Sequence, residues 1–179
     1  MDNHVLLTNY LSNLKVDLFM ADYNLCGRDW RDLDYTPDYS KFYFICDGEG
    51  WLKIGDREYY PKPGQLFLMP EGVKQSYSCI SDQPFEKYWC HFSAKVGDIN
   101  LFKMLELSHV CREVDPHVIQ EIFSSLTSHM KSDAVYAHLL AKSKLMELFS
   151  YFIMNIDVDE ITFKNLSSIE KLTKILTYI

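Results

Sequence analysis

The side chains best suited to binding a small molecule lie on one strand-like segment, FEKYWCHFS (residues 85–93). Because side chains alternate between the two faces of a β-strand, Lys87, Trp89 and His91 share one face of it. An indole can stack on the C–H groups of a ring, and an amine can bind its hydroxyl groups. This face therefore predicts a site for a sugar or another polar metabolite. The alternatives are that Trp89 is an ordinary core residue and that His91 is a structural histidine.

Other patterns that would carry chemistry are missing from the sequence. It has no G-x-S-x-G elbow, no P-loop and no G-x-G-x-x-G after a predicted strand. The acid pairs Asp32/Asp34 and Asp157/Asp159 lie in predicted loops, where a solvated surface is the simpler explanation. We therefore predict no catalytic residue and no cofactor, and we do not expect an enzyme.

Composition limits the class of protein further. The chain has 179 residues, of which 47% are hydrophobic and 24% charged, enough for one core with an appendage. A net charge of −7 argues against direct binding to DNA phosphates. Five cysteines without a C-x-x-C pair indicate reduced thiols and a cytoplasmic protein. The start lacks a basic signal-peptide region, and the most apolar run, 145–156, is too short to span a membrane.

The first half of the chain predicts short β-strands. Asp-Gly and Gly-Asp pairs separate them, and glycine supplies the positive φ that tight turns need. Their spacing is typical of a sandwich or barrel. The predicted strands are 15–23, 41–46, 51–54, 57–60, 65–69 and 85–93.

The second half predicts helices, at 98–107, from Asp115 onward and at 135–156. Asp115 is a favourable N-cap, and a proline follows it in the first turn. The apolar stripe of the helix at 135–156 is wider than one contact with a barrel requires. It could form the seam of a homodimer or pack on the barrel, or both. The residues assigned to the seam are Leu139, Leu145, Met146, Phe149, Phe152 and Ile153. A further capped helix begins near 167 and stops in mid-pattern, as if the chain were cut.

The segment PGQLFLMPEGVKQSYS (63–78) has a recognisable spacing. Gly64, Pro70, Gly72 and position 75 match the second cupin motif. With FICDGEGWLKI before this segment and YWCHF after it, the chain resembles the N-terminal ligand-binding and dimerisation domain of AraC-type (AraC/XylS) transcriptional regulators.

This resemblance implies an α+β fold, in which a cupin-like barrel (a double-stranded β-helix or jelly roll) precedes an antiparallel helix pair. It also implies three regions. They are a ligand-binding barrel at 1–96, a helical dimerisation region at 97–160, and a linker with the start of a truncated DNA-binding domain at 161–179.

The positions that bind a metal in cupins are altered here. The glutamate position is Lys41, the preceding loop 33–40 has no histidine, and position 75 is glutamine. A divalent cation needs three or four converging ligands. We therefore expect no bound metal.

The resemblance also implies ligand contacts. The position of Trp89 stacks on the ligand in sugar-sensing members, and Lys87 and Tyr77 fall on other pocket positions. Three further residues near an early strand could supply a guanidinium or an aromatic contact, although a surface role is equally open: Arg28, Trp30 and Arg31.

Together these features predict an effector-sensing, dimer-forming part of an AraC-type regulator. The effector would be a small molecule, with a carbohydrate suggested by analogy with sugar-sensing members, and DNA would be contacted only through a C-terminal domain outside this chain. Two alternatives stay open. One is a cupin metalloenzyme with an atypical metal set, and the other is a stand-alone small-molecule-binding cupin.

Overall fold

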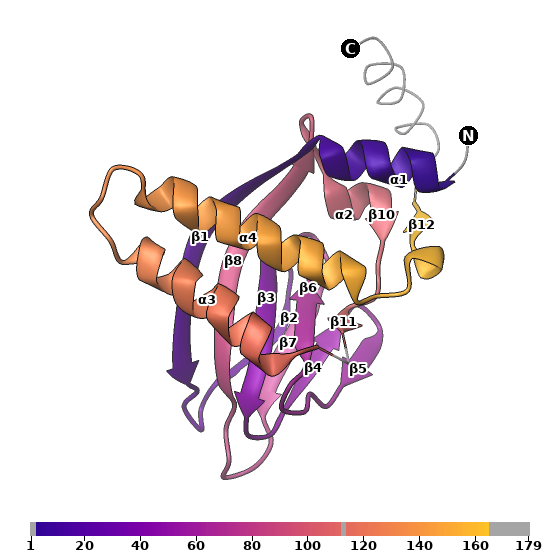
Figure 1. The fold of residues 1–179 in the computed structure, drawn as a ribbon. Helices are drawn as coiled ribbons and strands as arrows, with labels where there is room; N and C mark the ends of the chain where they lie inside the picture. Colours follow the sequence, from indigo (N-terminus) through magenta and orange to yellow (C-terminus); the bar gives the residue numbers. More distant parts are fainter. Residues whose placement is uncertain (1–2, 112–113, 165–179) are drawn as a thin grey trace.

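Two antiparallel sheets form the centre of the computed structural model, which describes residues 3–111 and 114–164 (Figure 1). The first sheet has the strand order β1-β8-β3-β6-β11, and β9 pairs with β8. Its strands are β1 (Leu14–Leu25), β3 (Ser40–Asp47), β6 (Leu66–Met69), β8 (Glu86–Val96), β9 (Ile99–Asn100) and β11 (Val110–Cys111). The second sheet has the order β2-β7-β4-β5. Its strands are β2 (Arg31–Tyr35), β4 (Gly50–Ile54), β5 (Arg57–Tyr59) and β7 (Gln75–Cys79).

The helices lie on the first sheet. In Figure 1, α3 and α4 run across the face formed by β1, β8 and β3, and α1 is drawn above the C-terminal half of α4. The helical elements are α1 (Asn3–Ser12), α2 (Leu101–Met104), α3 (Pro116–Met130), α4 (Ala137–Met154) and the 3-10 turn η1 (Val158–Glu160). A two-stranded ladder of β10 (Leu105–Glu106) and β12 (Thr162–Phe163) joins the segment after α2 to the segment after α4.

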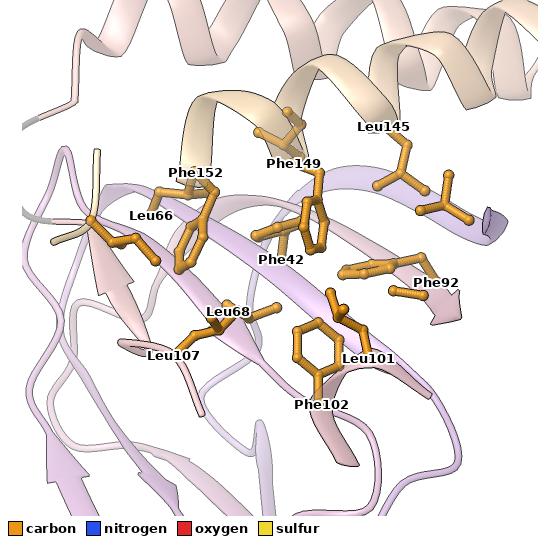
Figure 2. Packing of buried hydrophobic residues seen from close by; sticks show 14 of the residues in the cluster. Phe42, Leu66, Leu68, Phe92, Leu101, Phe102, Leu107, Leu145, Phe149 and Phe152 are labelled. Carbon is orange, nitrogen blue, oxygen red and sulfur yellow. The ribbon is translucent and has the colours of Figure 1, made fainter. Parts of the chain in front are cut away.

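A large apolar core fills the space between the first sheet and the helices (Figure 2). Phe42 of β3 and Phe92 of β8 stack with their ring centroids 4.9 Å apart. Phe149 and Phe152 of α4 approach the Phe42 ring at 5.9 and 5.4 Å. Aromatic contacts of this kind add to the hydrophobic gain from burial, so this face holds the helices on the sheet.

Most of the predicted strands are confirmed, and so are the predicted turns. Gly64 and Gly72 of the cupin-like motif have φ values of +86° and +74°, which only glycine adopts without strain. The strands β2 and β7 are not predicted by the sequence, because their short polar segments lack clear alternation. The helix α1 is not predicted either.

The predicted helix at 98–107 is wrong. Only Leu101–Met104 is helical, and Asn100 rather than Asp98 caps it, by accepting a hydrogen bond from the backbone N–H of Phe102. Leu101, Phe102, Met104, Leu105 and Leu107 are all buried. Packing of these residues against the sheet and against β12 divides the segment into a single helical turn and a short strand.

The two helices predicted from Asp115 onward and at 135–156 are confirmed. Asp115 caps α3 by accepting a hydrogen bond from the backbone N–H of His117 at 2.9 Å. The helix predicted at 135–156 is α4. The helix predicted from 167 onward falls outside the described residues. The architecture is α+β, with a cupin-like barrel followed by an antiparallel helix pair, as predicted. Within the described ranges, no helix combines the length and apolar character needed to cross a membrane.

Candidate functional site

A cavity of about 260 Å³ lies between the two sheets, on the side of the first sheet that faces away from the helices. Five of the seven residues predicted to bind a ligand line it: Trp30, Tyr77, Lys87, Trp89 and His91. Five more lining residues were not predicted as ligand contacts: Asp22, Asn24, Tyr39, Lys41 and Tyr43. The volume suits a single-ring metabolite and is below the range usual for drug-sized ligands.

The walls of the cavity are largely aromatic. Trp30 and Tyr77 stack with centroids 4.2 Å apart and an interplanar angle of 19°. Trp89 lies 4.7 Å from the His91 ring, and its indole N–H donates to the side-chain oxygen of Asn24 at 2.7 Å. Trp89 is only partly buried, so its position fits a cavity wall better than a closed core.

Lys41 and Gln75 come together at the floor of the barrel. These two residues stand at the positions that carry a glutamate and a histidine in metal-binding cupins. The Lys41 ammonium donates to Gln75 Oε1 at 3.2 Å and to the Tyr35 hydroxyl. The Gln75 amide donates in turn to the backbone carbonyl of Pro70 at 2.8 Å. The two positions that were compared with the cupin motif are thus adjacent in space, and the Lys41 amine lies beside the Gln75 amide.

Lys87 places a second amine in the same cavity. Its side chain is 3% exposed, and its ammonium donates to the Cys26 thiol at 2.8 Å. It also lies 4.5 Å from the ring centroid of Trp30 and 5.0 Å from that of Tyr43. A cation over an aromatic face is attracted by the ring quadrupole, which partly replaces lost hydration.

The surroundings of Lys41, Lys87 and His91 lower the pKa of each of these side chains. Burial lowers the pKa of Lys41 to about 7; nearby Asp32 opposes this shift, and the charge of Lys87 adds to it. Burial likewise lowers the pKa of Lys87. Burial, with repulsion from both lysines, lowers the pKa of His91 to about 4, so His91 is neutral near pH 7.

The carboxylates near the two amines do not form ion pairs with them. Within residues 3–111 and 114–164, neither Lys41 nor Lys87 forms an ion pair. Asp22 is the carboxylate among the lining residues, and it pairs with Lys131 at 2.8 Å. That pairing lowers the pKa of Asp22. Within the described residues, the two amines are therefore the basic groups of the cavity, and no ion pair neutralises them.

Arg28 and Arg31 lie outside the lining of the cavity. Arg28 pairs with Asp82 at 3.1 Å, and its side chain is 74% exposed. Arg31 is exposed on β2. Both arginines thus lie on the surface, which was one of the two positions that the sequence left open. The basic side chains that line the cavity are Lys41, Lys87 and His91 instead.

The residues of the predicted dimer seam differ in how much of their surface a single chain leaves exposed. Leu145, Phe149 and Phe152 are buried against the first sheet within a single chain, so they cannot also contact a second chain. The wide stripe is explained by packing on the sheet. Leu139 is 71% exposed, and Met146 and Ile153 are partly buried. Only these three of the six residues have surface left for a partner.

The described part of the chain contains no cluster of three or more histidine, cysteine or acidic side chains suited to holding a metal ion. The main omission of the sequence analysis was Lys41 as a pocket residue. A signal for it existed, since KFYFIC (41–46) puts a lysine on the central strand of a sheet, where lysine is rare unless it has a role.

The fold and the cavity together define a cupin-like ligand-binding domain. The family model "AraC-like ligand binding domain" matches residues 24–149, and the chain belongs to this family.

Solved structures give more distant similarities. The structure of apo ToxT from Vibrio cholerae is 17% identical with a TM-score of 0.50, covering 93% of this chain and 65% of that one. Salicylate 1,2-dioxygenase from Pseudaminobacter salicylatoxidans is 17% identical, with a TM-score of 0.37 and coverage of 44% and 26%. The cupin domain of Cnp3 from Schizosaccharomyces pombe is 15% identical, with a TM-score of 0.37 and coverage of 44% and 59%. This chain thus spans less than two thirds of each of these proteins. The search of curated proteins finds no match.

Proposed function

We propose that this chain is the effector-sensing part of a cytoplasmic AraC-type transcriptional regulator and that the cavity between its sheets is the effector site. The observation that carries the proposal is the convergence of Trp30, Tyr77 and Trp89 with two buried amines in one cavity of a domain of this family. The effector is a small metabolite, and a carbohydrate scaffold would suit the aromatic walls. The site holds no catalytic group in this proposal, and its output is a change of conformation.

The strands of the first sheet offer a direct route for that change. On β3, Lys41 and Tyr43 face the cavity while Phe42 faces α4; on β8, Trp89 faces the cavity and Phe92 faces the helices. A ligand that moves either strand must therefore shift the packing beneath the helix pair. The ligand can bias two arrangements only by its difference in affinity for them, commonly ~1–3 kcal/mol in such systems.

The rest of the mechanism follows from the family. DNA is contacted by a helix-turn-helix domain outside this chain, and a homodimer places two such domains on paired half-sites. In this proposal, the dimer contact uses the exposed side of the helix pair around Leu139, rather than the buried stripe of α4.

A thermal-shift screen of sugars and small metabolites tests the effector site. A ligand that binds only the folded state raises the melting temperature by mass action. Trp89→Ala removes an aromatic wall and should abolish the shift produced by any ligand found in the screen. Trp51→Ala is the matched control, since Trp51 lies outside the cavity lining and its indole bonds Glu58 at 3.1 Å.

Two results would contradict the proposal. One is a ligand whose thermal shift is unchanged in Trp89→Ala but lost in Trp51→Ala, since it would bind elsewhere. The other is stoichiometric iron, manganese, nickel or zinc in the purified protein, which would favour the metalloenzyme alternative.

A further inference from the structure

We propose that the effector is an anion and that its carboxylate is bound by the ammonium groups of Lys41 and Lys87. This inference rests on the proposed effector site and adds the chemical class of the ligand. It also gives a reason for the loss of the metal positions, because a lysine now supplies the positive charge at the floor of the barrel.

The first argument is the burial of two charges without a counter-charge. Lys41 is 2% exposed and Lys87 is 3% exposed. Their hydrogen-bond partners are a phenol, an amide and a thiol, and none of them is a carboxylate. Lysine is almost never fully buried without an ionic partner, because desolvating an ammonium is costly. In the described residues that partner is missing, and a bound anion would supply it.

The second argument is the convergence of the two amines. Lys41 approaches the cavity from β3 and Lys87 from β8, and both lie over the ring of Tyr43, at 5.9 and 5.0 Å from its centroid. A small ligand seated over Tyr43 is therefore within reach of both. The neutral His91 offers no competing positive charge, and the Asp22 carboxylate is occupied by Lys131 at the rim.

The third argument concerns the remainder of the ligand. The stacked pair Trp30 and Tyr77, with Trp89 beside them, suits one flat ring or the C–H face of one sugar. The carboxylate could therefore belong to a uronic acid or to an aromatic acid. The shared chemistry is a single-ring carboxylate.

The test uses matched pairs of probes that differ in charge. D-glucuronate is compared with D-glucose, and benzoate with benzamide, by thermal shift and by calorimetric titration of the whole chain. We expect an acid to bind and its neutral partner to bind at least tenfold more weakly. Lys41→Met and Lys87→Met should each weaken binding of that acid at least tenfold, because each removes a charged hydrogen bond. Lys53→Met, which removes a surface amine paired with Glu58, should bind normally.

The variants give a second measurement that needs no ligand. If the amines lack a counter-charge in the free protein, Lys41→Met or Lys87→Met should raise its melting temperature while binding is lost. A strong fall in melting temperature in both variants would overturn the inference.

The outcomes separate the two proposals. If the neutral probes bind as well as the acids and Trp89→Ala abolishes that binding, the anion inference fails and the effector site stands. If none of the four probes binds, the anion inference fails, and the screen of the previous subsection decides the effector site alone. If the acids bind preferentially but both lysine variants retain that binding, the assignment to Lys41 and Lys87 is overturned.

Discussion

The two faces of β3 and β8 differ in what they contact and in whether their side chains have matching partners. The outer face presents Phe42 and Phe92 to α4, where aromatic rings pack at 4.9 to 5.9 Å with no exposed surface. The inner face presents Lys41 and Lys87 to a cavity, where neither forms an ion pair within the described residues. Residues adjacent in sequence therefore have different roles: one set stabilises the fold, and the other, in the proposed function, binds the effector. Functional sites often trade stability in this way.

The largest expected effect is on the outer face. Phe152→Ala removes a fully buried ring that contacts Phe42, and large-to-small changes of this kind cost ~3–5 kcal/mol. Chemical denaturation should show this fall in the free energy of unfolding. Phe19→Ala is the control, since Phe19 is 49% exposed and its loss should cost far less. Equal effects at both positions would contradict the assignment of α4 to the core.

A change on the inner face should have the opposite sign and a smaller size. Lys41→Met replaces a buried ammonium with an apolar chain of similar length and should stabilise the free protein by about 1–2 kcal/mol near pH 7. The gain should also depend on pH. The pKa of Lys41 is about 7 when folded and 10.5 in its unperturbed state, so the unfolded chain binds more protons between these values.

The stability of the wild-type protein therefore rises with pH across this window, as far as Lys41 determines it. The penalty is complete below about pH 7 and disappears above 10.5. The advantage of Lys41→Met should accordingly be largest at or below neutral pH and shrink as pH rises toward 10. Other groups face this amine from every side: Asp32 and Tyr35 on β2, Tyr39 and Tyr43 near β3, Gln75 and Tyr77 on β7, and Lys87 and His91 on β8. An advantage of constant size between pH 6 and 10 would show that Lys41 does not titrate in this window.

The smallest effect concerns the helix cover of the outer face. Asp115→Ala removes the side-chain cap of α3 and should cost ~1 kcal/mol. Asp98→Ala is a useful control, because Asp98 was predicted to cap a helix but Asn100 does so instead. Denaturation midpoints of the two variants compare the positions directly, and a larger loss at Asp98 would contradict the cap assignment.

Sequence patterns were enough to predict much of the fold. Alternation over 85–93 placed Lys87, Trp89 and His91 on one face of a strand. The turn glycines marked where neighbouring strands end. The structure of the segment that follows β8 was harder to predict. The segment 98–107 has a helical composition, but five of its six apolar residues are buried, and only the surrounding sheet and β12 determine where each one points.

The residues that line the cavity could be predicted only in part, because some of them come together only through tertiary packing. Residues on one strand share a face by geometry alone, which is why the contacts from β8 were found. Lys41 and Gln75 are 34 positions apart, and their contact depends on the pairing of two sheets. The sequence analysis considered both residues only as lost metal ligands. Similarly, the stripe of α4 was visible in the sequence, but whether it met a sheet or a second chain depended on tertiary packing.

The ion pair between Asp22 and Lys131 connects the rim of the cavity to the C-terminal end of α3. Both side chains are substantially exposed, so the pair contributes little to stability and is weakened by salt. An anion arriving in the cavity would repel Asp22 and compete for Lys131. In the proposed mechanism, the charge of the cavity would therefore reach the helix pair through the surface as well as through the sheet, and ionic strength would modulate only the first of these two routes.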